Sequence, residues 1–172
     1  MIVDMMNTLD FPNGPKLARR GLVVARRIAR LKRRFSKRGL PVIYANDNFG
    51  AWHVDFRTLV EACAKGPGGA WVEALRPDES DYYILKPMHS AFYATPLRVL
   101  LQQLCVERVV LCGVATDACI AATAIDAHMG EFDVVVPADC VQAETAPRNA
   151  AALRLLRTSF QVDTRTADRI RL

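Results

Sequence analysis

Twelve consecutive residues decide the fold of this chain: Arg108-Val109-Val110-Leu111-Cys112-Gly113-Val114-Ala115-Thr116-Asp117-Ala118-Cys119. Residues 108–112 are a short apolar run, which is typical of a strand that is covered on both faces of a sheet. After a turn, Thr116 or Asp117 can cap a helix over residues 117–129, and Gly130 is a suitable stop signal. The stretch therefore predicts a strand, a turn and a helix, which together are the repeating unit of an α/β protein.

The same alternation continues on both sides of this stretch. Further strands are expected at residues 2–3, 41–45, 82–85 and 133–136, with a short sixth strand at 161–162, and helices at residues 24–35, 96–104 and 148–156. This order predicts a three-layer, doubly wound α/β fold, with a mostly parallel sheet of about six strands and helices on both faces. We expect residues 1–172 to form one domain.

Two segments of the chain are unusual. Residues 66–69 read Gly-Pro-Gly-Gly and lack the Lys-Ser/Thr ending of a phosphate-binding loop, so we interpret them as a linker between a helix and the third strand. The first strand has only three residues before Asp4, about 10 Å of extended chain, although it should be central in the sheet. We therefore expect the natural protein to have several residues before Met1.

The composition limits the classes of function. About half of the 172 residues are hydrophobic (51%), yet no apolar run approaches the roughly 18 residues of a membrane span, so we expect no membrane partner. The five cysteines include no pair with the C-x-x-C spacing of zinc or redox motifs. Reduced thiols in a cytoplasmic protein are the simplest interpretation.

The net charge of +5 is concentrated in one helix. Residues 16–38 contain eleven Lys and Arg and no acidic residue, whereas the rest of the chain has 12 basic and 18 acidic residues. A nucleic acid, an acidic protein or an acidic lipid surface could bind such a helix. Its apolar positions already provide a face for the core, and no nucleic-acid-binding motif is present. We therefore interpret it as a solvated helix face and expect no nucleic-acid partner.

Three reactive side chains follow three different strands. Asp4 and Lys86 end the first and third strands, and Cys119 lies in the first turn of the helix after the fourth. The carboxyl ends of parallel strands converge, so these side chains can meet. A helix N-terminus and a nearby ammonium favour a thiolate, and Asp4 could accept the thiol proton. Backbone N–H groups of the turn at residues 113–116 and of Cys119 could bind an oxyanion. The pattern indicates a cysteine hydrolase.

Five motifs resemble those of the isochorismatase-like cysteine hydrolases, a superfamily that includes nicotinamidase and N-carbamoylsarcosine amidase. They are residues 2–7 (Ile-Val-Asp-Met-Met-Asn), 42–48 (Val-Ile-Tyr-Ala-Asn-Asp-Asn), 85–92 (Leu-Lys-Pro-Met-His-Ser-Ala-Phe), 113–119 and 136–141 (Val-Pro-Ala-Asp-Cys-Val), in family order. The resemblance implies a catalytic triad of Asp4, Lys86 and Cys119. It also implies a cis peptide bond between Val114 and Ala115, with the backbone N–H groups of Ala115 and Cys119 as the oxyanion site.

Departures from the family pattern refine this expectation. Metal-dependent members have an Asp-x-His group, but Asp47 is followed by Asn48 and Phe49, and His53 lies too far along the chain. We therefore predict no metal and no cofactor. Members that cleave a vinyl ether typically lack the cysteine, so Cys119 favours hydrolysis of a small amide, carbamoyl or similar C–N bond through a thioester. A non-amide substrate and a catalytically idle binding protein are the alternatives.

Substrate contacts are harder to assign. The candidates are Leu9, Asn48, Trp52, His89, Phe92 and Thr116. Leu9 stands near the early Asn, where many family members have Phe, which predicts a less aromatic wall. His89 could equally be an ordinary loop histidine, and the aromatic residues could equally pack at a surface or subunit interface. By analogy with the family, we expect a small-molecule substrate and a homo-oligomer, either a dimer or a tetramer.

Overall fold

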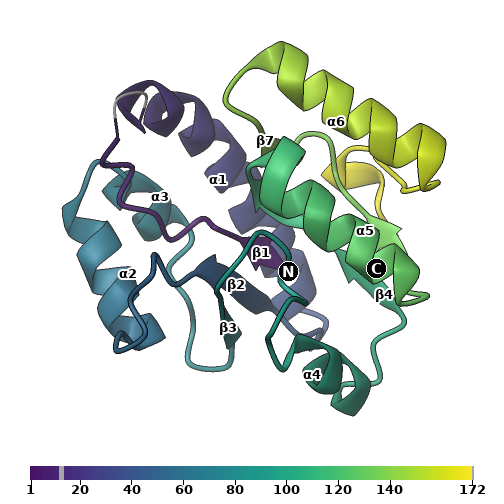
Figure 1. Ribbon diagram of the computed structural model, residues 1–172, viewed down its shortest axis with the longest axis horizontal. Helices are drawn as coiled ribbons and strands as arrows, with labels where there is room; N and C mark the ends of the chain where they lie inside the picture. Colours follow the sequence, from purple (N-terminus) through teal and green to yellow (C-terminus); the bar gives the residue numbers. More distant parts are fainter. Residues whose placement is uncertain (12–13, 172) are drawn as a thin grey trace.

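A parallel sheet with helices on both of its faces forms the centre of the computed structural model, which describes residues 1–11 and 14–171 (Figure 1). The strands are β1 (Ile2–Val3), β2 (Ile43–Asp47), β3 (Tyr82–Lys86), β4 (Arg108–Val110), β5 (Cys112–Val114), β6 (Asp133–Val135) and β7 (Val141–Gln142). The helices are α1 (Gly14–Ser36), α2 (Phe56–Lys65), α3 (Gly69–Ala74), α4 (Leu97–Gln103), α5 (Ala121–Met129) and α6 (Ala146–Ser159), with a π-helical turn η1 (Thr116–Ile120) and a 3₁₀ turn η2 (Ala167–Arg169).

Five strands form the main sheet in the order β3-β2-β1-β5-β7, and every pairing among them is parallel. A parallel pair of β4 and β6 forms a second, two-stranded sheet. The short strand β1 is central, because Ile2 and Val3 pair with β2 on one side and β5 on the other. The predicted parallel α/β fold is therefore confirmed, with a sheet of about the expected size.

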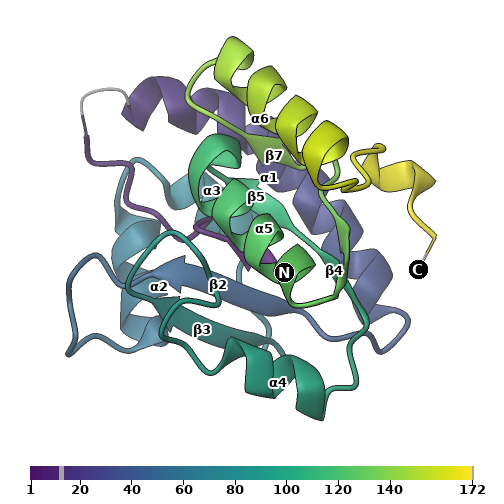
Figure 2. The ribbon, with the colours of Figure 1, turned by 45° about the vertical axis from the view of Figure 1, so that its right-hand side comes forward.

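Side chains along the strands alternate between two apolar clusters, which makes the fold three-layered. Ile2 and Tyr44 pack with α1, α2 and α3 on one face, whereas Val3, Ile43 and Ala45 pack with α4, α5 and α6 on the other. Strands that are buried on both faces have the nearly continuous apolar sequences noted above. Figure 2 shows the helices on the two sides of the sheet.

The strand expected at residues 108–112 is divided at Leu111. The backbone N–H of Leu111 donates to the carbonyl of Val135, but the next N–H, that of Cys112, donates to the carbonyl of Met1. The chain thus changes its partner from β6 to β1 at this point and forms β4 and β5 instead of one strand. Residues 161–162 form no strand, and only an isolated bridge joins Val135 to Asp163.

The interpretation of residues 66–69 as a linker before the third strand is wrong. This segment joins α2 to α3, a helix that the sequence interpretation missed, and Gly69 is the first residue of α3. The N–H of Gly68 donates to the carbonyl of Thr8, and a Cβ on Gly68 would lie 1.9 Å from the carbonyl oxygen of Asn7. Glycine is needed here because the turn packs directly on the loop that follows Asp4.

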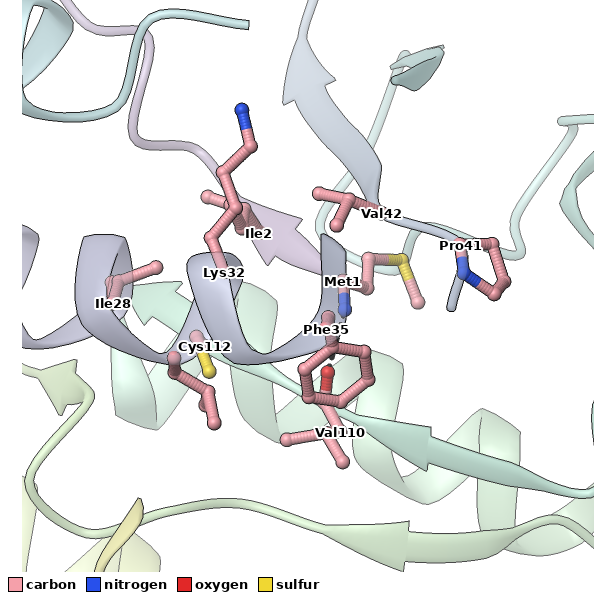
Figure 3. A pocket seen from close by; sticks show the side chains of 10 residues that line it. Met1, Ile2, Ile28, Lys32, Phe35, Pro41, Val42, Val110 and Cys112 are labelled. Carbon is pink, nitrogen blue, oxygen red and sulfur yellow. Dashed lines mark hydrogen bonds between the residues drawn. The ribbon is translucent and has the colours of Figure 1, made fainter. Parts of the chain in front are cut away.

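The amino end of β1 lies at the opposite edge of the sheet from Asp4. The Met1 ammonium is buried and donates to the carbonyl of Val110 at 2.6 Å. A cavity of about 20 Å³ lies beside it, between the side chains of Met1, Phe35 and Val42 (Figure 3). Such a volume holds about one water molecule, so it is too small for a substrate.

The basic residues of α1 divide into two groups. Lys32 is buried and pairs with Asp81 at 2.6 Å, Arg34 donates to the carbonyls of Ala167 and Ile170, and Arg27 donates to the carbonyl of Asp139. The exposed group comprises Arg19, Arg20, Arg26, Arg30 and Arg33, and is continued by the exposed Lys37 and Arg38 directly after the helix. Part of the basic character therefore ties α1 to the rest of the fold, and the remainder faces solvent as expected.

Substitution of Gly21 by Ala tests the packing of α1 on α3. A Cβ at Gly21 would lie 1.9 Å from Cζ2 of Trp71, whose indole N–H donates to the carbonyl of Ala18. On an exposed helix, Gly to Ala stabilises by about 1 kcal/mol. Here we expect Gly21→Ala to lower the free energy of unfolding by about 1–3 kcal/mol, measured by urea denaturation, because the overpacked indole must move.

The matched control is Val23→Ala on the same helix, where the side chain is 53% exposed. Its free energy of unfolding should stay within about 0.5 kcal/mol of the unmodified chain. A Gly21→Ala variant that is more stable than the unmodified chain would show that α1 and α3 are not packed this closely.

Candidate active site

Asp4, Lys86 and Cys119 meet at the carboxyl edge of the sheet. Asp4 directly follows β1, Lys86 is the last residue of β3, and Cys119 lies in η1, the helical turn that follows β5. Because these strands are parallel, their ends lie at one edge, and the arrows of β2 and β3 in Figure 2 point toward it. The three predicted residues are therefore brought into contact.

The Lys86 ammonium is fully buried and contacts groups from several other parts of the chain. Its Nζ donates to Oδ2 of Asp4 at 2.9 Å, to the carbonyl of Met88 at 3.1 Å and to Sγ of Cys119 at 3.5 Å. A second carboxylate, Oδ2 of Asp47, lies 3.7 Å away. Burial lowers the pKa of Lys86, but Asp4, Cys119 and Asp47 together more than offset this, so the pKa is raised and Lys86 remains charged.

Asp4 is a buried carboxylate with two fixed hydrogen bonds. Its Oδ1 accepts from the N–H of Asp47 at 2.7 Å, and its Oδ2 accepts from Lys86. Asp4 has a φ of 51°, in the left-handed region that Asp tolerates better than most residues. Burial raises its pKa above the ordinary value, although the Lys86 ammonium opposes this rise. A carboxylate in this environment is a better proton acceptor than one in water.

The Cys119 sulfur lies between a carboxylate and an ammonium, which act on its pKa in opposite directions. Burial and the neighbouring Asp4 carboxylate raise the pKa of Cys119 to about 12, and the Lys86 ammonium offsets only part of this rise. The ammonium thus favours the thiolate, as expected, but burial and Asp4 outweigh it in the resting protein. Cys119 is a thiol at neutral pH, and its proton must be transferred before the sulfur can attack.

A buried hydrogen bond to α6 holds the turn that carries Cys119 in place. Thr116 is fully buried and its hydroxyl donates to Oδ1 of Asn149 at 2.5 Å, an oxygen that also accepts from the N–H of Ala143. The Thr116 side chain thus holds the turn against α6, and its hydroxyl is directed toward Asn149. The peptide bond between Val114 and Ala115 is cis, as the resemblance implied.

The remaining candidates for substrate contact lie in different environments. His89 is exposed, and its Nδ1 is 3.6 Å from Sγ of Cys119. Leu9 is buried in the core, and Asn48 uses its side-chain oxygen to accept from the N–H of Gly50. Trp52 is 77% exposed on the loop after β2. His89 therefore lies next to the Cys119 sulfur, whereas Leu9 is part of the core.

Phe92, the last candidate, is half-buried beside Phe132, with 6.0 Å between the ring centroids.

Asn46 and Asp47, at the end of β2, support the site although the sequence motifs assigned them no such role. The side chain of Asn46 accepts from the N–H of Met6 and donates to its carbonyl, and the N–H of Asp47 binds Asp4. The polar run at the end of an otherwise apolar strand was the available signal for both.

Within residues 1–11 and 14–171, no three His, Cys, Asp or Glu side chains are grouped so that they could hold a metal ion. The side chain of Asp47 is directed to Lys86 at 3.7 Å, and its Oδ1 accepts from the N–H of Phe49. The side chains described above can hold and move protons around the sulfur, and a carbonyl carbon is their natural target.

Comparison with known proteins gives a consistent result. A family model, the isochorismatase domain, matches residues 1–168. An uncharacterized isochorismatase family protein of Bacillus subtilis, YaaI, is 32% identical over 170 residues, which cover 99% of this chain and 94% of that protein. Maleamate amidohydrolase of Pseudomonas putida is 27% identical over 176 residues, with 98% of this chain and 80% of that protein covered.

The same fold occurs in a solved structure. The crystal structure of N-carbamoylsarcosine amidase from Thermoplasma acidophilum has a TM-score of 0.76 and 24% sequence identity, and the match covers 99% of this chain and 96% of that one. The resemblance drawn from the five motifs is thus confirmed across nearly the whole chain.

Substitution of Asp4 by Asn tests the electrostatics of the thiol. Because the Asp4 carboxylate raises the pKa of Cys119, its removal should lower that pKa and increase the thiolate fraction at neutral pH. We expect iodoacetamide to modify Cys119 faster in Asp4→Asn, about tenfold for each unit by which the pKa falls. Peptide mass spectrometry measures the rate at Cys119.

Two controls accompany this measurement. Cys63 is fully buried and should stay unmodified as long as the variant is folded. Asp133→Asn removes an exposed carboxylate at the amino edge of the sheet and should leave the rate at Cys119 unchanged. An equal or slower rate in Asp4→Asn would mean that Asp4 does not control the state of the thiol.

Proposed function

Because this chain belongs to the isochorismatase family, we propose that it is a hydrolase of the C–N bond of a small amide, carbamoyl or similar compound, with Cys119 as its nucleophile. The contact of Cys119 with both Lys86 and Asp4 is the observation that carries this proposal. A thiol beside a buried proton acceptor and a fixed ammonium is suited to attack on a carbonyl carbon. The family also includes amidohydrolases, such as the maleamate amidohydrolase noted above.

The first half-reaction makes a thioester. Asp4 takes the proton of Cys119, and the sulfur forms a bond to the carbonyl carbon of the substrate. The backbone N–H groups of Ala115 and Cys119 bind the developing oxyanion. When the C–N bond breaks, the proton on Asp4 goes to the departing nitrogen, which leaves as ammonia or an amine. Lys86 stays charged throughout and stabilises the negative charge on the sulfur.

The second half-reaction returns the enzyme to its resting state. Water adds to the thioester carbonyl, the C–S bond breaks, and an acid is released while Cys119 regains its proton. Because Asp47 is followed by Asn48 and Phe49 instead of the Asp-x-His group of metal-dependent members, these steps are proposed without a metal or other cofactor. The presence of Cys119 favours this amide chemistry over cleavage of a vinyl ether.

We propose further that the protein works as one domain in the cytoplasm, as a homo-oligomer with a small-molecule substrate. Exposed large apolar side chains favour association: Tyr83 of β3, and Trp52, Met88 and Tyr93 in the loops after β2 and β3, are each more than half exposed. All five cysteines are free, which suits a reducing compartment. In the described part of the chain, no helix has the length and apolar character of a membrane span.

Release of ammonia from a panel of small amides and N-carbamoyl compounds tests this function. We expect Cys119→Ala to lower turnover of any active compound by about 10³-fold or more, because the nucleophile is lost. Cys105→Ala, which changes an exposed cysteine, is the matched control and should keep full activity. Turnover that persists in Cys119→Ala would contradict the proposed mechanism, whereas a panel in which no compound is hydrolysed would favour the alternative of a non-amide substrate.

A further inference from the structure

The Cys119 sulfur has a second basic neighbour that the mechanism above does not use. Nδ1 of His89 lies 3.6 Å from Sγ, so this nitrogen can accept from the thiol or donate to the thiolate, according to where the imidazole carries its proton. His89 is exposed, whereas Asp4 is only 6% exposed. The sulfur therefore has one base on its buried side and another on its solvent side.

His89 belongs to a loop that is held on both sides of it. The carbonyl of Met88, just before it, accepts from the Lys86 ammonium at 3.1 Å. The N–H of Ala91, two residues after it, donates to the buried hydroxyl of Thr123 at 3.0 Å. The backbone of this exposed histidine is thus attached to the catalytic lysine and to α5. An imidazole on an anchored loop can keep a defined position beside the sulfur.

Asp4 is suited to only one of the two half-reactions. Its oxygens accept from the N–H of Asp47 and from Lys86, and its carboxylate is buried next to the sulfur. From there it reaches the thiol proton of Cys119, which the first half-reaction requires. The second half-reaction needs a base for a water molecule that arrives from solvent, and His89 is the base on that side.

We propose that His89 is a catalytic residue, the general base that activates water to hydrolyse the Cys119 thioester. The inference rests on the proposed function, because it requires an acyl group on Cys119. The imidazole takes one proton from water while the water oxygen bonds to the thioester carbon. The C–S bond then breaks, the sulfur leaves with the electron pair, and the imidazolium returns its proton to the sulfur. The products are a carboxylic acid and the resting thiol.

The assignment of Asp4 to the first half-reaction and of His89 to the second is tested with His89→Gln and any amide that the enzyme hydrolyses. Gln keeps polar atoms near the sulfur but cannot take up a proton at neutral pH. We expect kcat to fall by about 10²-fold, as on loss of a general base, while the first turnover releases ammonia at the wild-type rate. Intact mass spectrometry of acid-quenched enzyme should then find the acyl group accumulated on Cys119.

Two further measurements complete the test. Hydroxylamine attacks a thioester without a base and releases the acyl group as a hydroxamate, so it should restore the turnover of His89→Gln. Added imidazole should do the same for His89→Ala by occupying the vacated position. His53→Gln changes another exposed histidine at this edge and should retain wild-type kinetics in every assay.

Three results would overturn the role of His89: first-turnover ammonia release that slows in parallel with kcat, no acyl group on Cys119 in a slowed variant, or an unchanged kcat in His89→Gln. Each of these leaves the proposed function intact, provided that Cys119→Ala is inactive. An active Cys119→Ala enzyme would instead remove the proposed function and this inference together.

Discussion

The buried ammonium of Lys86 contacts groups from four parts of the chain. Asp4 follows β1, Asp47 ends β2, Met88 follows β3, and Cys119 lies beyond β5. A buried charge is tolerated only with such partners, and removing one member of a buried pair typically costs about 3–5 kcal/mol. The ion pair of Lys86 with Asp4 is therefore the interaction that the site depends on. The parallel sheet makes this ion pair possible because it brings the carboxyl ends of four strands to one edge.

The same pair determines the chemical state of the sulfur. Asp4 and burial keep Cys119 protonated at rest, while Lys86 stays charged and is ready to stabilise a thiolate once the proton has moved. In the proposed mechanism, the site therefore stabilises the charges that form during the reaction more than those of the resting state, as expected of an enzyme that binds its transition state best. His89, on the solvent side, has a different environment and is suited to a different step.

Sequence patterns predicted those features that depend on local chemistry and on strand periodicity. The parallel α/β fold, most of the strands and the positions of Asp4, Lys86 and Cys119 at strand ends followed from apolar runs and polar termini. Features set by contacts between distant segments did not follow. The partner change at Leu111, the helix α3 and the role of Thr116 depend respectively on β1, on the loop around Asn7 and Thr8, and on Asn149. The thiol state also depends on burial and on the distance to Asp4, neither of which a sequence contains.

The most direct test of the central claim, that Cys119 becomes the covalent nucleophile of an amide hydrolase, is mass spectrometry of the enzyme quenched in acid during turnover of an amide. We predict a mass increase equal to the acyl part of the substrate, located on the peptide that contains Cys119 and released as the substrate is consumed. An acyl group on any other residue of an active enzyme would contradict it.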